Sequence, residues 1–490
     1  MSGLVQRSTR LETDVLVVGS GAGGATTAAL LAEAGIDVLI VEEGPWVDQD
    51  TVRPFSLEQM DVQYRSGGVT VALGLPSIAY TEGRCAGGGT EVNSGLYFRP
   101  PADVIDQWRS EYRIDDLRLD DIDAIADEVE QAINVTAVPG APTPASERLR
   151  RGAAALHWRH SEIPRWMIYP PGGDAVTGKR QSMTRTYLPR AFAAGARMVV
   201  DCRVDRLTRH GTRNVLAEIS YGDGTRGSIR CRDVFVCGGA IQTPALLQRS
   251  GFRKRVGNTL AVHPTVKLAA RFADEINVPD DVPVHQVKEF APHLSFGGSA
   301  SHPGLVALAL SDHWREFQRA ITDWRRISVY YAAITSEGRG LVKAVPGLRD
   351  PLVTYRLTHR DRALLGSGLA RLALLMLEAG ADEVYPSFRN APVVRNRADL
   401  DTLTSRFAAS KATVMTVHLC STVPMGEDLS RCGADSFGRV HGTQEIYVND
   451  ASLLPSAPGV NPQATVMAIA IRNARQYIDA RARVRETGRG

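Results

Sequence analysis

Long apolar runs are missing from this 490-residue sequence. No stretch approaches the roughly 18 consecutive apolar residues that a membrane-spanning helix needs, so we expect no transmembrane segment. The stretch 1–12 also lacks the apolar core of a secretory signal. These absences predict a cytoplasmic protein.

Cysteine is scarce as well, with six residues in the whole chain. None forms a CxxC pair or a zinc-ligand spacing, and in a chain of this length we expect free thiols rather than a disulfide framework. No two histidines have the helical HxxxH spacing beside a carboxylate. The sequence therefore predicts no bound metal ion.

A large excess of one charge sign is also absent. The sequence has 57 Lys and Arg residues and 54 Asp and Glu residues, for a net charge of +3. The densest basic runs, 253–255 and 481–489, are short and typical of a solvated surface. No nucleic-acid motif occurs, so we expect no nucleic-acid partner. The chain is 43% hydrophobic and 23% charged, which indicates a globular protein with room for two or more domains.

Glycine, in contrast, is plentiful, and its first cluster follows an apolar run. Residues 14–18 predict a buried strand that leads into Gly-Ser-Gly-Ala-Gly-Gly at 19–24. An alanine-rich helix is expected over 25–34, and a second strand over 38–41 ends at Glu42. This order of strand, glycine turn, helix, strand and acid predicts a dinucleotide-binding unit.

Each position of this unit has a physical role. Gly19 permits the tight turn, Gly21 lets the backbone approach a pyrophosphate, and Gly24 lets the helix pack closely on the strand. The helix N-terminus near Ala22 offers free N–H groups to phosphate. Glu42 can accept hydrogen bonds from a ribose, which argues against NADP but does not separate FAD from NAD.

A second glycine cluster, Arg-Cys-Ala-Gly-Gly-Gly-Thr-Glu-Val-Asn at 84–93, is followed by Arg-Pro at 99–100. Here the sequence resembles the glucose–methanol–choline (GMC) oxidoreductases, whose first signature has this form. Consecutive glycines let a backbone lie against the flat flavin ring. The resemblance implies that FAD is the cofactor and that this segment contributes Arg84, Gly88, Gly89, Asn93 and Gly95 to its site.

Two further segments extend the resemblance. Residues 238–251 follow an apolar strand at 234–237 and resemble the second GMC signature, and residues 256–263 resemble the family segment VG-x-x-L-x-x-H. Val204 occupies the position at which the family places a valine against the adenine. Both glycine-containing stretches are therefore expected to contact or position the FAD.

The C-terminal part completes the resemblance. Residues 447–455 resemble the family strand that ends in DAS-x-x-P, and a helix is expected over 466–478. In the family this region faces the flavin, and the helix dipole stabilises negative charge on the reduced ring. The resemblance assigns further cofactor contacts to this region: Asp450, Ala451, Asn461, Pro462 and Gln463.

The resemblance runs from residue 14 to residue 477 and implies an α/β protein, α+β overall. It predicts a discontinuous Rossmann-like FAD-binding domain and a substrate domain with a mainly antiparallel sheet covered by helices. The FAD-binding domain is expected to use 1–100, 190–265 and 410–490. The substrate domain is expected to use 101–189 and 266–409.

Within the substrate domain, three stretches carry a recognisable pattern. The strand-like runs 327–331 and 352–355 are expected in the sheet that covers the flavin. The leucine spacing over 364–379 predicts an amphipathic helix packed in the core.

His418 is the candidate general base, because it opens a segment that resembles the family's H-x-x-G-T-x-x-M-G and histidine titrates near neutral pH. Asn461 follows 43 positions later, where the family keeps His or Asn, and its amide can donate to a developing alkoxide. Ser421 and Pro424 stand where the family has a glycine and an arginine. These two replacements affect what the resemblance implies about the shape of this loop. The remaining histidines, including His263, are interpreted as structural.

The residue at position 92 concerns how FAD is held. Some family members attach FAD through a histidine just before the signature asparagine, and Val92 cannot form that bond. FAD is therefore expected to be non-covalent.

The substrate is expected to be a small-molecule alcohol. Residues 98–108 and 459–462 resemble the long-chain fatty-alcohol oxidase and cholesterol oxidase branches, which favours a hydrophobic or bulky alcohol. A sugar or a hydroxylated natural product is the alternative, and a catalytically silent flavoprotein is less favoured. Oxygen and another electron acceptor both remain open, as does the oligomeric state.

Overall fold

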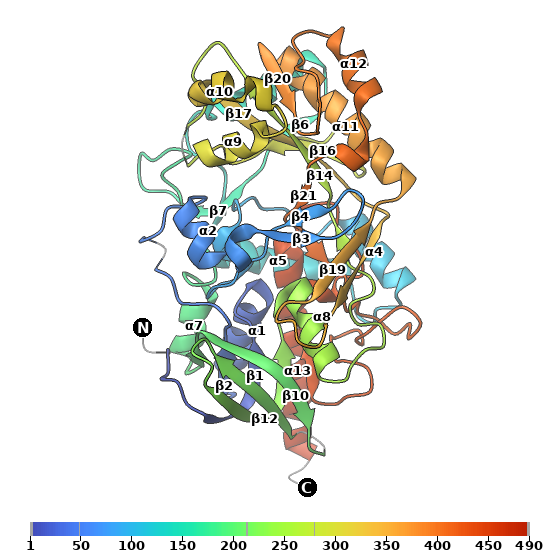
Figure 1. The fold of residues 1–490 in the computed structure, drawn as a ribbon. Helices are drawn as coiled ribbons and strands as arrows, with labels where there is room; N and C mark the ends of the chain where they lie inside the picture. The colour runs from blue at the N-terminus through green and yellow to red at the C-terminus, as the bar shows by residue number, and fades with distance from the viewer. Residues whose placement is uncertain (1–2, 49, 212–213, 279, 488–490) are drawn as a thin grey trace.

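The computed structural model describes residues 3–48, 50–211, 214–278 and 280–487. Two β-sheets lie one above the other, each with helices packed against it, and both ends of the chain lie beside the lower sheet (Figure 1). The lower sheet has seven strands and the upper sheet has nine. The architecture is mixed α/β, as the sequence predicts.

The seven-stranded sheet is built around β1, which pairs in parallel with β2 on one side and β12 on the other. Val15, Leu16 and Val17 of β1 are fully buried, as a strand covered on both faces requires. The strands are β1 (Arg10–Val18), β2 (Val38–Val41), β9 (Arg197–Val199), β10 (Cys202–Arg209), β11 (Val215–Tyr221), β12 (Arg226–Val236) and β23 (Ile446–Val448).

Helices α1 and α13 pack together on this sheet beside the β1–β2 crossover. Gly19 has a φ of +97°, and a Cβ on Gly24 would lie 2.0 Å from the Gly19 carbonyl oxygen. Glycine is therefore required at both ends of the turn. The helices around this sheet are α1 (Ala22–Glu33), α4 (Ala102–Glu111), α5 (Leu119–Ala132), α7 (Tyr187–Ala193), α8 (Gly239–Arg249) and α13 (Gln463–Thr487).

The nine-stranded sheet is mainly antiparallel, with one parallel pair between β21 and β4. Its strands are β3 (Thr70–Ala72), β4 (Ile78–Tyr80), β6 (His160–Glu162), β14 (Thr265–Arg271), β15 (His285–Val287), β16 (Leu294–Gly298), β17 (Ile327–Ile334), β20 (Glu383–Pro386) and β21 (Val414–Thr416). The run 327–331 lies in β17, as predicted.

Helix α11 (His359–Glu378) covers β14 and β17 and confirms the helix expected over 364–379. It begins earlier because Thr358 and Asp361 form a capping box that satisfies the first backbone N–H groups. Its own Leu365, Leu369 and Leu372 are fully buried against the sheet. Other helices are α2 (Leu57–Gln63), α3 (Gly89–Val92), α6 (Pro144–Ala155), α9 (Pro303–Leu310), α10 (Trp314–Thr322) and α12 (Asp399–Arg406).

The expectation for 352–355 is wrong in one respect. This run forms β19 (Leu352–Arg356), which pairs with β18 (Arg339–Lys343) in a separate hairpin. A single bridge between Leu73 and Thr354 connects the hairpin to the loop after β3. Alternate burial suits both a hairpin and a larger sheet, so the pattern does not distinguish them. The remaining strands are β5 (Val135–Thr136), β7 (Arg165–Ile168), β8 (Lys179–Arg180), β13 (Ala261–Val262) and β22 (Leu419–Cys420).

The two halves exchange segments more than the expected domain division suggests. Strands β3, β4 and β21 come from the segments assigned to the FAD-binding domain but pair in the nine-stranded sheet. Helix α5 comes from the segment assigned to the substrate domain but packs on α13. The division into two domains stays a prediction. Among the described helices, none combines the length and apolarity that a membrane crossing needs.

Candidate active site

A cavity of about 440 Å³ runs from the end of β1 to the start of α13. It brings together both glycine clusters, the end of β2, the start of β10 and the C-terminal segment. The predicted site residues that line it are Gly19, Gly21, Ala22, Glu42, Gly88, Gly89, Asn93, Gly95, Val204, His418, Asp450, Ala451, Asn461, Pro462 and Gln463.

The two glycine clusters meet in this cavity. A Cβ on Gly88 would lie 3.0 Å from the Cα of Gly21, and a Cβ on Gly19 would lie 2.4 Å from the Cys237 carbonyl oxygen. Side chains at these positions would fill the space, so the wall is backbone. With the N-terminus of α1 beside it, such a wall fits a pyrophosphate, whose charge the free N–H groups stabilise.

Glu42 holds the first glycine turn in place as well as lining the cavity. One carboxylate oxygen accepts hydrogen bonds from the Ser20 backbone N–H (3.0 Å) and hydroxyl (2.7 Å), and the other accepts from the Gly44 N–H (3.0 Å). Burial raises the pKa of Glu42 against the effect of these bonds. Its remaining lone pairs are available to a ribose hydroxyl.

Two predicted residues do not line the cavity. Gly24 lies at the contact between α1 and β1, which is the packing role expected of it. Arg84 instead turns toward Glu43, donating to its carbonyl oxygen at 3.3 Å with its side-chain Nε 3.6 Å from the carboxylate. The contact between Arg84 and the cofactor stays a prediction, since the side chain lies against Glu43 rather than along the cavity wall.

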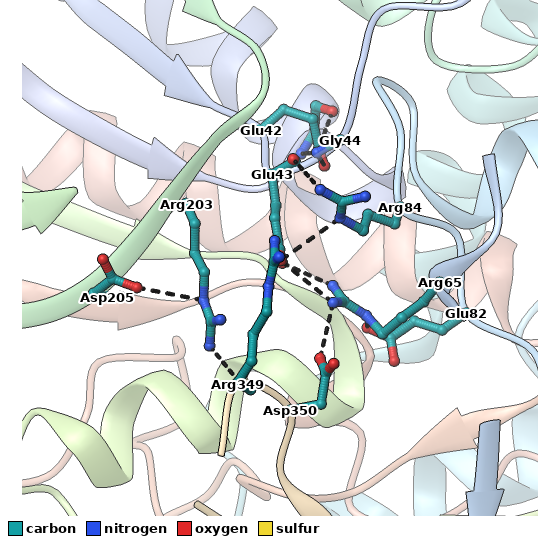
Figure 2. A network of polar contacts seen from close by, with 11 residues as sticks. Glu42, Glu43, Gly44, Arg65, Glu82, Arg84, Arg203, Asp205, Arg349 and Asp350 are labelled. Atoms are coloured by element: carbon teal, nitrogen blue, oxygen red, sulfur yellow. Dashed lines mark hydrogen bonds and ion pairs between the residues drawn. The ribbon is translucent and has the colours of Figure 1, made fainter. Parts of the chain in front are cut away.

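Glu43 is the centre of a charged cluster that the sequence does not reveal (Figure 2). Its carboxylate contacts Arg65 at 2.8 Å and Arg349 at 3.1 Å. Burial raises the pKa of Glu43, but the guanidinium groups of Arg65, Arg203 and Arg84 together outweigh burial and lower this pKa to about 2. Arg65 also pairs with Glu82 at 2.8 Å and with Asp350 at 3.0 Å. The cluster joins the strand that follows the first glycine turn to the loop of the β18–β19 hairpin.

His418 immediately precedes β22 and lines the cavity. Its Nδ1 lies 2.9 Å from Nδ1 of His263, and the Gly459 N–H donates to Nε2 of His263 at 3.0 Å. Neutral His263 must therefore carry its proton on Nδ1 and donate to Nδ1 of His418. This places the proton of neutral His418 on Nε2.

Burial lowers the pKa of His418 to about 4, with a further contribution from the charge of Lys288. Burial also lowers the pKa of His263 well below its ordinary value, and His418 adds to this effect. Both rings are neutral at neutral pH. The interpretation of His263 as purely structural needs correction, since it contacts His418 directly. Its place in the VG-x-x-L-x-x-H segment was the available signal.

Asn461 lines the same cavity as His418, just before α13 begins at Gln463. Nearby, the Asn93 side-chain N–H donates to the Gln463 side-chain oxygen at 2.7 Å, and the Asn93 side-chain oxygen accepts from the Gly95 backbone N–H at 2.9 Å. The second glycine cluster and the start of α13 are thus joined. Val92 also lines the cavity and has no nucleophilic atom for covalent attachment.

The departure at Ser421 leaves the loop geometry intact. Ser421 has a φ of +68°, the left-handed conformation that explains glycine in the family. Its hydroxyl donates to the Pro455 carbonyl at 2.7 Å, and its N–H donates to the Ala451 carbonyl at 3.1 Å. These bonds tie the His418 loop to the segment that follows Asp450.

The parts of this cavity define the class of protein. A strand, a glycine turn and a helix N-terminus beside a second backbone wall form a flavin-dinucleotide site. Residues 12–69 match an FAD binding domain, and residues 60–265 and 339–470 match the GMC oxidoreductase models. The chain belongs to the GMC oxidoreductases and is an FAD-dependent oxidoreductase. Within the described residues no cluster of His, Cys, Asp and Glu could hold a metal ion.

Relatives extend over nearly the whole chain. The uncharacterized GMC-type oxidoreductase y4nJ of Sinorhizobium fredii is 38% identical, over 97% of this chain and 96% of that protein. The long-chain-alcohol oxidase FAO3 of Arabidopsis thaliana is 25% identical, over 94% of this chain and 67% of that protein. The structure of pyridoxine 4-oxidase from Mesorbium loti has a TM-score of 0.71 at 20% identity, over 95% of this chain and 99% of that chain. This last similarity shows a shared fold.

Proposed function

We propose that the protein oxidises an alcohol to the corresponding carbonyl compound at the junction between the FAD cavity and a smaller neighbouring cavity. The observation that carries the proposal is the position of His418 and Asn461, which are far apart in sequence but line both cavities. Bound FAD supplies the acceptor for the hydride that leaves the alcohol carbon. The chain itself must hold the alcohol oxygen and receive its proton.

His418 is the proposed base, and its hydrogen bonds set a condition on this role. In the resting arrangement its proton is on Nε2, so His418 first offers an N–H to the alcohol oxygen. To accept the hydroxyl proton at Nε2, His418 must move its own proton to Nδ1 and donate to His263. His263 must then carry its proton on Nε2, which requires the Gly459 N–H to release that atom. Gly459 lines the smaller cavity, so its N–H lies next to the space that a substrate would occupy.

Asn461 has the complementary role in this proposal. Its amide N–H donates to the alcohol oxygen as negative charge develops there, and it does not exchange protons at neutral pH. The N-terminus of α13 begins two residues later and places a positive dipole end at the same wall.

The two substrate hypotheses differ in how they fit the smaller cavity. Its wall contains apolar side chains such as Leu96 and Ile334, but also Lys267, Gln286 and Lys288. The resemblance to fatty-alcohol oxidases and the relative of that name support a hydrophobic alcohol. The charged part of the wall supports the alternative, a polar hydroxylated compound, and we favour that alternative here.

The test measures anaerobic reduction of the flavin by a panel of alcohols, and stopped-flow absorbance gives the rate. A positioned base contributes about 10²–10⁴-fold, so His418→Ala should slow reduction at least roughly a hundredfold while FAD stays bound. Asn461→Ala should slow it by a smaller factor, because it removes one donor. His359→Ala, at the exposed start of α11, is the matched control. Reduction of His418→Ala at the wild-type rate would show that the base lies elsewhere.

A further inference from the structure

The smaller cavity, of about 130 Å³, adjoins the His418–Asn461 pair and contains two lysines. Lys267 and Ser299 line both this cavity and the FAD cavity, whereas Lys288 lines the smaller one. The lysines therefore lie within the space in which the alcohol must be held, and their chemistry constrains what that alcohol can be.

The two ammonium groups approach from the same sheet. Lys267 is on β14, and its Nζ donates to the Ser299 hydroxyl at 3.0 Å. Lys288 follows β15, and its Nζ lies 4.4 Å from the centre of the Phe98 ring. Gln286, also on β15, donates from its amide to the Tyr331 hydroxyl at 3.1 Å. Ser299 and Phe98 contact the lysines but carry no charge that would neutralise them.

The charges of this cavity are unbalanced. No Asp or Glu stands among the described residues that line it, and the other basic side chains there are His263 and His418. Burial lowers the pKa of Lys267 and of Lys288 to about 8 in each case, and no neighbouring carboxylate opposes this effect. Both lysines are therefore mostly protonated at neutral pH, next to two neutral imidazoles. Partly buried cations without a counter-ion are costly unless a ligand supplies negative charge.

We propose that the alcohol oxidised at His418 belongs to a molecule that also carries a carboxylate, and that Lys267 and Lys288 bind this carboxylate. The inference rests on the proposed function, since it identifies the substrate class of the same site. The carboxylate is unchanged in the reaction, in which the hydroxyl-bearing carbon becomes the carbonyl. Gln286 and Ser299 can add neutral hydrogen bonds to its oxygens.

The first experiment compares matched substrates on the FAD-loaded protein. 6-Hydroxyhexanoate and 6-hydroxyhexanamide differ in the charge at one end, and 4-hydroxybutanoate with its amide forms a shorter pair. Charge-assisted hydrogen bonds favour the acid over the amide. The acid should therefore reduce the flavin with a second-order rate constant about ten to a hundred times that of the amide.

Variants then assign this preference to the lysines. Lys267→Met and Lys288→Met should each reduce the acid-to-amide ratio several-fold, and the double variant should bring the ratio near unity. Lys343→Met, on an exposed position of β18, is the control and should keep the wild-type ratio. A loss of rate that is equal for acid and amide would overturn the proposal, because it would mean that the lysines act on the flavin.

A binding measurement does not depend on turnover. Hexanoate, which has no hydroxyl to oxidise, should perturb the flavin absorbance with a dissociation constant that rises as the pH passes above about 8, where the lysines lose their protons. His263 and His418 titrate below neutral pH, and burial raises the pKa of Tyr331 above its ordinary value, so these groups do not produce this change. The pH effect should vanish in the double variant.

The outcomes separate the two proposals. Reduction of the flavin by alcohols without any preference for the acid would overturn this inference and leave the proposed function standing. Lysine-dependent binding of hexanoate without reduction by any alcohol or hydroxy acid would support the anion site and overturn the proposed function. Hexanoate and hexanamide binding equally well would overturn the anion site.

Discussion

At the scale of single residues, the chemistry of the site depends on a short chain of hydrogen bonds. The Gly459 N–H, His263 and His418 are linked in that order, and this order determines which ring nitrogen of neutral His418 carries the proton. The Gly459 N–H lies outside the motif that contains His418, yet it determines the tautomer of that histidine. The protonation state of His418 depends on its own pKa, and the tautomer of its neutral ring depends on this donor.

The lowered pKa of His418 predicts a distinctive pH profile. Its imidazole can accept a proton when neutral, so flavin reduction by a neutral alcohol should be nearly constant from about pH 8 to pH 5. The rate should then fall as the pH decreases through about 4, because the protonated ring cannot act as a base. An unperturbed histidine would lose activity around pH 6.5.

Stopped-flow reduction across this range measures the profile, with the flavin spectrum at each pH as the check that FAD remains bound. Lys288 and His263 are the charged and titratable neighbours of His418. A rate that falls around pH 6 to 7 would contradict the expected depression of the His418 pKa.

At the scale of elements, local patterns account for what the sequence predicts correctly. The first strand, glycine turn, helix and second strand are contiguous, so apolar runs and glycine spacing suffice to place them. The leucine periodicity of the capped helix α11 also lies within one contiguous segment, so it suffices to place that helix. The Glu43 cluster, the His263 contact and the two cavity lysines were missed because each depends on segments that are distant in sequence. The prediction puts the run 352–355 in the wrong sheet, because the residue pattern of one strand does not show which strand it pairs with.

The contact between α1 and β1 provides a test at this scale. A Cβ at residue 24 would lie 2.0 Å from the Gly19 carbonyl oxygen, so Gly24→Ala must push the helix away from the glycine turn. Overpacking of this kind costs about 1–3 kcal/mol, and it also moves the phosphate-facing N–H groups. The variant should unfold at a lower temperature and retain less FAD after gel filtration.

Gly304→Ala, in α9, is the matched control, because no atom lies within 4 Å of its added Cβ. It should keep both the unfolding temperature and the FAD content of the wild-type protein. Full FAD occupancy in Gly24→Ala would contradict the role given to this contact.

At the scale of the whole molecule, the cluster around Arg65 joins segments that the chain order keeps apart. Arg65 binds Glu43, Glu82 and Asp350, and both Arg65 and Glu43 are largely buried. Removing the cation leaves the buried Glu82 carboxylate without an ion-pair partner and leaves Glu43 with only Arg349 and Arg84. Arg65→Met should therefore lower the free energy of unfolding by about 3–5 kcal/mol, as measured by urea denaturation of the FAD-loaded protein.

Arg349→Met is the control, since the Arg349 side chain is 59% exposed and such pairs contribute about 0–1 kcal/mol. The pKa of Glu43 falls from an ordinary 4.5 to about 2 on folding. The contribution of its ionised form is present above pH 4.5 and is lost as the pH falls toward 2. The difference between wild type and Arg65→Met should shrink over the same range. Equal stability of Arg65→Met and Arg349→Met would contradict this account.

The pairing of the first helix with the last strand has a consequence for how the protein acquires its cofactor. The Asn449 amide donates to the Thr27 hydroxyl at 2.8 Å across 422 positions of sequence, and Asp450, Ala451 and the start of α13 line the same cavity as the first glycine turn. Ribosomes release the N-terminal part first. The glycine turn therefore emerges long before the residues from 450 to 466 that line the same cavity, so the complete FAD cavity forms only after both segments have been synthesised.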